Sequence, residues 1–464
     1  MPMLPLKEKP FLNVESIGNS VALETFFDAD KDDFMNNKAR KGLELLVDLG
    51  TGYPIDGIYN PIDADYVLAF SSGRLFKIDH AVTTEITGVT INGGTPVKMA
   101  DFGNQGFFCN DSRIVKWVYA DATCAFIADA DAPTNATHLG FIDQYLVALI
   151  ADSAQFEWSD VNDPDTWLGE YATAESRPDN AVALVSAFGE IFIPGSRVIE
   201  NWVDSGDPVS PFQRIPGTST ERGSISPYSF AQIDNSYMFL DSGRRVIRML
   251  GREPQVISNP FDAEFQALDT ITDAIGINFN AGGDTKYILT FPTADQTFVY
   301  DYKLDVWSKW SYWQEPNGVR RRWLGNCGCM VPTWNQYLVG SKTDGKIYIA
   351  GDYDDDAGNT KQTEIITGRI DWGTSKRKSC NRLRVKVKRG TGGLSTSQKI
   401  IMNYRDNGKM QWSHDKVIDL GIAGDNESYK TFRNLKTYRD RQWRFRGTST
   451  DLLLVSAEED FTVV

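Results

Sequence analysis

The chain has 464 residues, more than one ordinary compact domain holds, and 41% of them are hydrophobic against 24% charged, which excludes a wholly disordered protein. Aromatic residues (12%), with 39 Gly and 19 Pro, favour strands and turns over helices, and no run approaches the roughly 18 apolar residues of a membrane span. The formal net charge is −14, and five cysteines are too few for a disulfide scaffold, so we expect reduced thiols.

The N-terminal residues give the weakest signals. Residues 1–10 lack a basic segment followed by an apolar core, so we expect neither a signal peptide nor a membrane anchor. The range Lys31–Asp48 has some helical character, although Gly42 and weak periodicity make it a marginal helix. We therefore predict an N-terminal arm over residues 1–44, with a short helix as one option.

A hairpin pattern recurs through the middle of the chain: a short apolar strand, a turn rich in Gly, Asp or Ser, and a second strand. It occurs in Tyr66–Asp79, Gly106–Trp117, Tyr145–Trp158, Glu190–Trp202, Tyr237–Arg248, Tyr287–Asp301 and Tyr337–Ile349. The first strands begin about 40 to 50 residues apart, the length of a four-stranded propeller blade. We predict an all-β fold with a β-propeller over residues 45–358. Six or seven blades are both possible, because one blade can combine strands from the two ends of the propeller.

The balance of charge changes sign near residue 360. Residues 361–446 contain 21 Lys or Arg against 8 Asp or Glu, a balance of +13, whereas residues 1–360 carry −23 and the last residues −4. Such a change predicts a domain boundary and surfaces with different partners. The basic part can bind nucleic acid, dock onto an acidic protein surface, or be evenly solvated.

Charged and apolar residues alternate with period two in the C-terminal part, which is typical of half-exposed strands. The pattern occurs in Arg382–Lys388, Lys399–Arg405, Gln442–Arg446 and Leu452–Ser456. It predicts a basic, β-sandwich-like module over residues 359–464. In its first strand we expect Leu383, Val385 and Val387 to face inward. The opposite face is the candidate docking surface, formed by Arg382, Arg384, Lys386 and Lys388.

The acidic turn at Asp352, Asp354 and Asp356 offers the oxygen ligands that calcium prefers. Gly358 falls one place late for an EF-hand, and the closing Glu is missing. A solvated loop of like charges is therefore the favoured interpretation.

Side chains for catalysis or metal binding are sparse. Cys327 and Cys329 form a C-x-C pair without a second Cys or His pair nearby, which argues against zinc. His80, His138 and His414 are far apart, which disfavours a His-dependent hydrolase. The sequence has no G-x-S-x-G, phosphate-loop or H-E-x-x-H motif. We predict no enzyme activity and no catalytic, cofactor or metal site.

The basic segment Arg320–Arg322, flanked by Trp313 and Trp323, can grip nucleic acid through charge and stacking. A basic loop at a protein interface is the favoured interpretation. The acidic body of the chain is suited to letting DNA slide, because like charge opposes adhesion to phosphate.

The segment Asp406–Trp412 resembles an Asp-box turn, which decorates hairpins of sialidase-type propellers, although its Trp lies one residue too far along. It keeps open the alternative of a propeller that binds or cleaves glycans at the host cell surface. A sialidase-like enzyme should have several good boxes, and this sequence has one imperfect box. A free-standing intracellular scaffold propeller is a third alternative, and would be monomeric.

Longer motifs are concentrated between residues 157 and 258. They are Trp158–Asp160, Asp163–Trp167, Ala174–Asp179, Gly195–Trp202, Pro211–Gly217, Glu221–Gly223, Gly251–Pro254 and Ile257–Ser258. Further motifs are Gly73–Asp79, Thr290–Pro292, Tyr300–Asp301, Trp307, Tyr404–Gly408 and Arg439–Trp443. In these motifs the chain resembles the tail-hub proteins of short-tailed bacteriophages, also called packaged-DNA stabilisation proteins or tail nozzles. The resemblance extends from about residue 45 to 455, and the first 40 residues match least.

The resemblance implies a virion protein, made in the host cytoplasm, that forms a ring of six propellers below the portal and its ring-shaped adaptor. The ring would continue the DNA channel, help retain the packaged genome and support tail fibres, tailspikes or a plug protein. Double-stranded DNA would pass through the lumen without sequence-specific binding. No cofactor is implied, and we expect the isolated chain to stay monomeric until it docks.

Overall fold

A computed structural model of the chain describes residues 21–23, 25–29, 35–207, 210–314, 319–353, 355–361, 363–388, 399–419, 427–447 and 453–464. Within these residues the regular structure is almost entirely β, and the helical elements are η1 (Asn259–Phe261) and α1 (Asp262–Gln266). No helix in this part of the chain is long and apolar enough to cross a membrane.

Backbone contacts group the chain into two compact units. Unit 1 comprises residues 1–44, 296–323 and 350–464, and unit 2 comprises residues 45–295 and 324–349. The predicted division into residues 1–44, 45–358 and 359–464 stays a prediction.

Unit 2 begins with five four-stranded meanders, in which consecutive strands pair antiparallel. The first two are β5 (Ile55–Tyr59), β6 (Val67–Ser71), β7 (Arg74–Asp79) and β8 (Val82–Gly88), then β9 (Lys98–Phe102), β10 (Gln105–Cys109), β11 (Val115–Val118) and β12 (Thr123–Phe126). The next two are β13 (Ala136–Ile142), β14 (Tyr145–Ile150), β15 (Gln155–Asp160) and β16 (Asp163–Thr173), then β17 (Val185–Ala187), β18 (Glu190–Pro194), β19 (Ile199–Asp204) and β20 (Phe212–Arg214). The fifth is β21 (Ala231–Ile233), β22 (Ser236–Leu240), β23 (Val246–Leu250) and β24 (Glu253–Val256).

Two further sheets complete unit 2. The sixth contains the antiparallel hairpin of β25 (Ile275–Ala281) and β26 (Asp284–Phe291). The seventh consists of β31 (Gly325–Val331), β32 (Gln336–Ser341) and β33 (Lys346–Gly351), with β4 (Gly42–Asp48) beside β33. The amide of Leu49 donates a hydrogen bond of 2.8 Å to the carbonyl oxygen of Gly345 at this junction. A strand from the N-terminal part of the chain thus completes the last sheet.

Adjacent sheets of unit 2 pack aromatic rings against each other. Ring pairs that join neighbouring sheets, with centroids 4.6–5.2 Å apart, are Phe70 with Phe108, Phe102 with Phe141, Phe156 with Trp202, Phe192 with Tyr237, and Phe279 with Tyr337. The Tyr287 hydroxyl of the sixth sheet donates to the carbonyl oxygen of Ser229, just before the fifth (2.6 Å).

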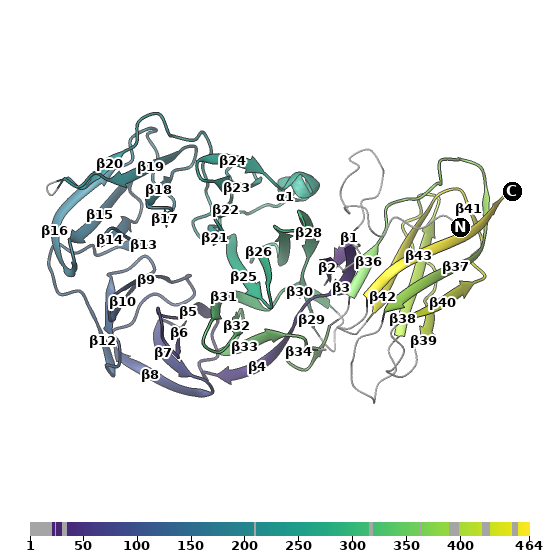
Figure 1. The fold of residues 1–464 in the computed structure, drawn as a ribbon, viewed down its shortest axis with the longest axis horizontal. Coiled ribbons are helices and arrows are strands. Elements are labelled where there is room, and N and C mark those ends of the chain that lie inside the picture. The colour runs from purple at the N-terminus through teal and green to yellow at the C-terminus, as the bar shows by residue number, and fades with distance from the viewer. Residues whose placement is uncertain are drawn as a thin grey trace. The chain divides into compact units, whose positions relative to one another are not determined.

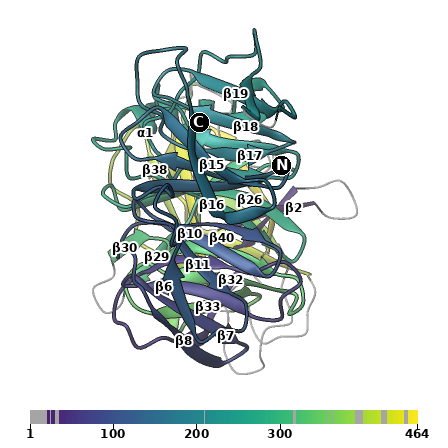
Figure 2. The ribbon, with the colours of Figure 1, turned by 90° about the vertical axis from the view of Figure 1, so that its left-hand side faces the viewer.

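The first and seventh sheets share a buried cluster that includes Ile55 and Leu338, so the series of sheets closes into a ring (Figure 1). The outer strands, among them β8 and β16, form the rim seen in Figure 2. Unit 2 is therefore a β-propeller of seven sheets, which confirms the predicted fold class and decides between the two predicted blade numbers.

The N-terminal part corrects one prediction, because the described residues of Lys31–Asp48 form no helix. They form β3 (Met35–Ala39) and β4. β3 pairs antiparallel with β2 (Thr25–Ala29). β4 covers the edge of β33, whose backbone groups a helix would leave without a partner, so tertiary pairing overrides a weak local propensity.

Unit 1 is built mainly from two sheets that pack face to face. Within unit 1, one sheet has the order β27-β28-β1-β36-β42-β38-β39, and the other has the order β2-β3-β43-β37-β40 with β41 paired to β37. The cluster between them includes Leu383 and Val385 from one sheet and Met402 and Trp443 from the other. This is the predicted β-sandwich-like module, and strands from the N-terminal part of the chain extend both of its sheets.

The strands of unit 1 have these bounds: β1 (Val21–Leu23), β27 (Gln296–Asp301), β28 (Val306–Lys309), β36 (Thr363–Ile366), β37 (Lys378–Lys388), β38 (Lys399–Asp406), β39 (Lys416–Asp419), β40 (Glu427–Arg433), β41 (Thr437–Tyr438), β42 (Arg441–Gly447) and β43 (Leu453–Val463). Two small hairpins accompany them. They are β29 (Ser311–Gln314) with β30 (Val319–Arg322), and β34 (Asp355–Asp356) with β35 (Asn359–Thr360).

Ile55→Ala should destabilise the propeller, because Ile55 is fully buried where the ring closes. Removing a buried aliphatic side chain of this size costs about 2–5 kcal/mol. Ile62→Ala is the matched control: its side chain is 73% exposed, and the free energy of unfolding should change by no more than about 0.5 kcal/mol. Urea unfolding followed by Trp fluorescence measures both. Equal losses would contradict the closing role of Ile55.

Candidate functional site

Strand β37 carries the predicted docking surface on one face. Leu383, Val385 and Val387 are buried in the sandwich core, as the alternation in the sequence predicts. The opposite face carries the partly exposed Arg382, Arg384 and Lys386, and also Lys388, whose side chain lies outside the described ones. A docking role for this face stays a prediction.

Strand β43 places two carboxylates beside these bases. Asp460 and Glu458 lie opposite Arg382 and Arg384 in the strand ladder, and Arg382 Nε donates to Asp460 Oδ2 at 3.1 Å. Both side chains of this pair are about one-third exposed, so the pair stabilises the fold by only about 0–1 kcal/mol. The face is less basic than the count over residues 361–446 suggests, because the acidic end of the chain folds back next to it.

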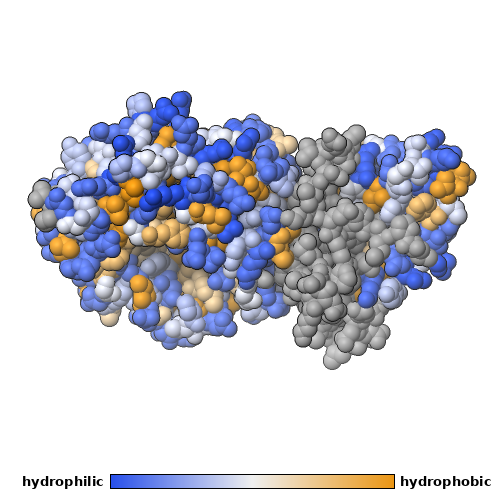
Figure 3. All heavy atoms as spheres, turned by 45° about the horizontal axis from the view of Figure 1, so that its top comes forward, coloured by the Kyte–Doolittle hydropathy of each residue, from blue (hydrophilic) through white to orange (hydrophobic). Residues whose placement is uncertain are grey.

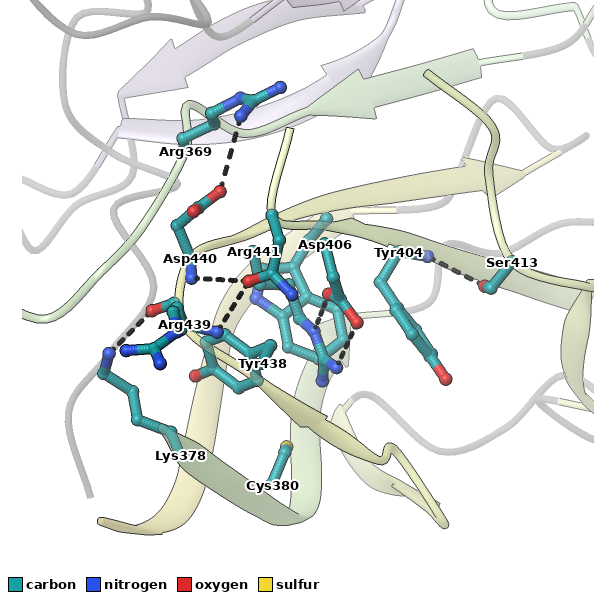
Figure 4. A network of polar contacts seen from close by, with 12 residues as sticks. Arg369, Lys378, Cys380, Tyr404, Asp406, Ser413, Tyr438, Arg439, Asp440 and Arg441 are labelled. Carbon is teal, nitrogen blue, oxygen red and sulfur yellow. Dashed lines mark hydrogen bonds and ion pairs between the residues drawn. The ribbon is translucent and has the colours of Figure 1, made fainter. Parts of the chain in front are cut away.

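A buried ion pair lies at the end of the sandwich where β38 meets β42 (Figure 4). Arg441 is fully buried, and its guanidinium donates from Nε to Asp406 Oδ1 (2.6 Å) and from Nη2 to Asp406 Oδ2 (2.9 Å). Its Cζ lies 4.1 Å from the ring centroids of both Tyr404 and Tyr438. A bidentate partner and two aromatic faces offset the cost of burying this charge.

The same region orders the loops around it. Asn407 Oδ1 accepts a hydrogen bond of 2.8 Å from the amide of Arg439, and Arg369 pairs with Asp440 at 3.4 Å. Lys378 Nζ donates to three backbone carbonyl oxygens at 2.6–3.0 Å. These contacts hold the loops 369–377, 404–413 and 433–440 together, and we call them the loop end.

The loop end is basic. Its exposed bases are Lys376, Arg377, Lys409, Arg433, Lys436 and Arg439. In these three described ranges Asp371 is the one exposed acid, because Asp406 and Asp440 are held in the ion pairs above. Met410 is 85% exposed beside these bases. The loop end therefore presents a positive surface with an apolar side chain at its tip.

Sequence reasoning missed the loop end, because its bases come from three segments far apart in the chain. The available signal was the pair of motifs Tyr404–Gly408 and Arg439–Trp443, which the fold brings together through Asp406 and Arg441. The Asp406 carboxylate is engaged by the buried Arg441 and so has a structural role, and the Asp-box-like turn does not support the glycan alternative.

The middle of the propeller is crossed by the segment Ser224–Phe230, which leads into the fifth sheet. Tyr228 stacks on His138 of the third sheet with ring centroids 5.7 Å apart, and Lys98 Nζ of the second sheet lies 5.6 Å from the Tyr228 centroid. The Tyr228 carbonyl oxygen accepts a hydrogen bond of 2.9 Å from the amide of Gly276 in the sixth sheet. One segment thus contacts the beginnings of the inner strands of three sheets and lies across one end of the propeller axis.

Burial shifts two pKa values at this axis. It lowers the pKa of His138 to about 3, with the charge of Lys98 as a smaller cause, and it lowers the pKa of Lys98 to about 8. The His138 Nε2–H donates to the carbonyl oxygen of Pro227 at 3.1 Å. His138 is therefore a neutral, structural side chain near pH 7.

The acidic turn after residue 351 contains a buried ion pair, which corrects the prediction of a solvated loop. The buried Asp356 carboxylate accepts two hydrogen bonds from Arg40, one of them 2.8 Å from Nη1 to Oδ1. The exposed Asp352 pairs with Lys41 at 2.8 Å. Among the described residues, no group of three His, Cys, Asp or Glu side chains could hold a metal ion, and all five cysteines carry free thiols.

The Arg-rich segment at residues 320–322 makes contacts within unit 1. Arg320 pairs with Glu364 at 3.6 Å. Trp323 is buried and packs edge-on against Trp310, with centroids 5.4 Å apart. A buried Trp323 offers no ring face to a nucleic-acid base, which weakens the predicted alternative of a nucleic-acid grip.

The family model described as bacteriophage P22 Gp10, beta-propeller, matches residues 59–352, which is more than half of the chain. This chain belongs to that family. It is thus a tail-hub or stabilisation protein of short-tailed phages, and the predicted resemblance is confirmed. The family is one of structural phage proteins, which places this chain among virion components. A comparison with curated protein sequences gives no match.

Several solved structures are similar at low identity. The extracellular domain of BT4673 from B. thetaiotaomicron is 8% identical, with a TM-score of 0.45, over 88% of this chain and 58% of that one. PorZ of the Porphyromonas gingivalis type-IX secretion system is 10% identical, with a TM-score of 0.40, over 74% of this chain and 44% of PorZ. YCF48 bound to D1 peptide is 10% identical, with a TM-score of 0.42, over 67% of this chain and 97% of YCF48. The chain thus covers less than two thirds of the first two.

Arg441→Met should destabilise unit 1 strongly, because it leaves the Asp406 carboxylate without its bidentate partner. Removing one member of a buried pair costs about 3–5 kcal/mol. Arg382→Met is the matched control, since its pair with Asp460 is partly exposed and worth about 0–1 kcal/mol. Urea unfolding measures both losses. Similar values for the two variants would contradict the structural role of Arg441.

His138→Gln should flatten the acid side of the stability profile. The folded-state pKa of His138 (about 3) lies below its ordinary value of 6.5, so the unfolded chain binds the proton more readily. The native protein therefore loses stability as the pH falls from 6.5 towards about 3. Gln keeps an N–H for the Pro227 carbonyl oxygen but does not titrate. Burial raises the pKa of Asp56 to about 6, so this group makes the native protein more stable as the pH falls, and it does so equally in the variant and the unmodified chain. Urea midpoints between about pH 4 and 7 test this, and parallel curves would refute it.

Proposed function

We propose that this chain is the ring-forming hub or nozzle of a short phage tail, below the portal and the head-to-tail adaptor. In this role it extends the DNA channel, retains packaged DNA and supports fibres, tailspikes or a plug. It acts by assembly and not by catalysis. The observation that carries the proposal is the family match over residues 59–352.

The segment that lies across one end of the propeller axis supports a ring of several copies. The segment Ser224–Phe230 lies across one end of this axis, where Tyr228 contacts His138 and Lys98. Duplex DNA therefore has no path through a single propeller. A channel for DNA requires copies arranged around a common lumen, which agrees with a ring-shaped assembly.

The distribution of charge supports passage of DNA without tight binding. Unit 2 carries a formal net charge of −19 and unit 1 carries +5, which together give the −14 of the chain. A protein that neutralises many phosphates binds DNA strongly, whereas an acidic wall repels it. An acidic propeller around the lumen would thus let DNA slide, and the basic module would serve contacts with neighbouring copies or with the adaptor.

Particles made without this chain should lose packaged DNA, and the purified full-length chain added to them should restore DNA retention. The count of DNA-filled particles by electron microscopy measures this, with infectivity as a second readout. A variant with Arg382, Arg384, Lys386 and Lys388 all changed to Glu should fold by circular dichroism but incorporate poorly, because summed charge steers docking. Full DNA retention in particles without the chain would refute the proposed function.

A further inference from the structure

The strand order of the propeller sorts its turns onto two faces. Each sheet begins with its inner strand, and the inner strands all run in the same direction along the propeller axis. Turns from the first to the second strand and from the third to the fourth strand therefore lie on one face. Contacts between neighbouring turns agree with this: Trp334 Nε1 donates to Asp65 Oδ1 (2.8 Å), and Arg252 pairs with Glu190 (2.5 Å). We call these turns, with one strand residue on either side, the turn face.

The turn face is acidic to an extent that the composition of unit 2 does not explain. Within unit 2 it contains twelve carboxylates whose side chains the structure describes and one base, Arg252. The carboxylates are Asp63, Asp65, Asp79, Asp121, Asp143, Asp160, Asp163, Glu190, Asp204, Asp207, Asp234 and Glu253. The other face is made of the remaining turns within unit 2 and the connections between its sheets, again with one strand residue on either side, and contains fifteen carboxylates and eleven bases. The acidic excess of the propeller is therefore concentrated on one side of the ring.

Exposed apolar side chains stand among these carboxylates. Those on the turn face are Ile62, Val82, Val161, Phe188 and Leu250, and Phe141 lies one residue before it. Figure 3 shows apolar residues interspersed with hydrophilic ones on the part of the propeller surface that it displays. Single exposed apolar residues are ordinary, but their collection on one acidic face is typical of a protein-binding surface.

The fitting partner is a basic surface with apolar side chains of its own. Like charges gathered on one face repel each other, and a basic partner relieves this repulsion and steers its own approach. The loop end of unit 1 has this chemistry, with six exposed bases against one exposed acid and with Met410 at its tip. We propose that the turn face of one copy binds the loop end of the next copy.

Two different, complementary surfaces on one chain make a heterologous interface, which generates a closed ring when the rotation between copies closes. This proposal rests on the proposed tail ring and adds the two surfaces that join its subunits. An isologous contact of either surface with itself would place like charges opposite each other.

Charge-reversal variants of the full-length chain test the pairing. Variant A carries Asp121→Lys, Asp143→Lys and Asp234→Lys on the turn face. Variant B carries Lys376→Glu, Arg377→Glu and Lys409→Glu on the loop end. All six side chains are exposed, and circular dichroism checks folding. The readout is the number of copies incorporated per particle when protein is added to particles made without the chain.

Variant A or B alone should incorporate at least about tenfold less than the unmodified chain, because each places like charges across the interface. An equal mixture of A and B should recover, because A and B can alternate around an even-numbered ring with opposite charges at every contact. A neutral turn-face variant changes Asp121, Asp143 and Asp234 to Asn. Its matched control changes Asp111, Asp152 and Asp269, on the other face, to Asn. The control should incorporate normally, and the turn-face variant should not.

Rescue by the mixture supports the proposal. If a chain carrying both sets of substitutions recovers but the mixture does not, the two surfaces meet within one chain, and the proposal falls. If neither recovers, the partner is another tail protein, and the proposal also falls. In both of these cases the unmodified chain still restores DNA retention, so the proposed function stands. If the unmodified chain itself fails to restore retention, the proposed function falls instead.

Discussion

Each sheet of the propeller has apolar residues on both faces, and a closed ring is the arrangement that covers both faces of every sheet. Closure depends on the contact between the first and seventh sheets, where Ile55 and Leu338 are buried together. It also depends on β4, a strand from the start of the described chain that completes the last sheet. These two contacts hold the seven sheets in a ring.

A common strand direction gives the propeller two chemically different faces. Alternate turns of each meander lie on the same side of the ring. Acidic residues at equivalent turns of successive sheets therefore form one acidic surface. At one end of the axis, Tyr228 stacks on His138 and lies beside Lys98, so these side chains make contacts within the propeller. The propeller is therefore suited to act through its faces, as a building block of a larger assembly.

The sandwich of unit 1 meets a different requirement. Its loops are long and basic, and they are held by a buried Arg441 between two tyrosine rings and Asp406. A buried charge of this kind is weak as a source of stability, but it fixes the geometry of the groups that satisfy it. The bases of the loop end are consequently displayed on an ordered surface, which lowers the entropic cost of binding a partner.

The sequence by itself determined the class of fold, because the hairpin pattern and the alternation in Arg382–Lys388 are local and repeat regardless of what lies around them. Tertiary structure decided the rest. Lys31–Asp48 has no strong local preference, and the open edge of β33 makes its last residues a strand. Asp406 and Arg441 are 35 residues apart, and β43 brings Asp460 next to Arg382 from 78 residues away. Charge counts along a chain cannot detect such pairs, nor a turn face built from every second turn, because both depend on which strands become neighbours and in which direction they run.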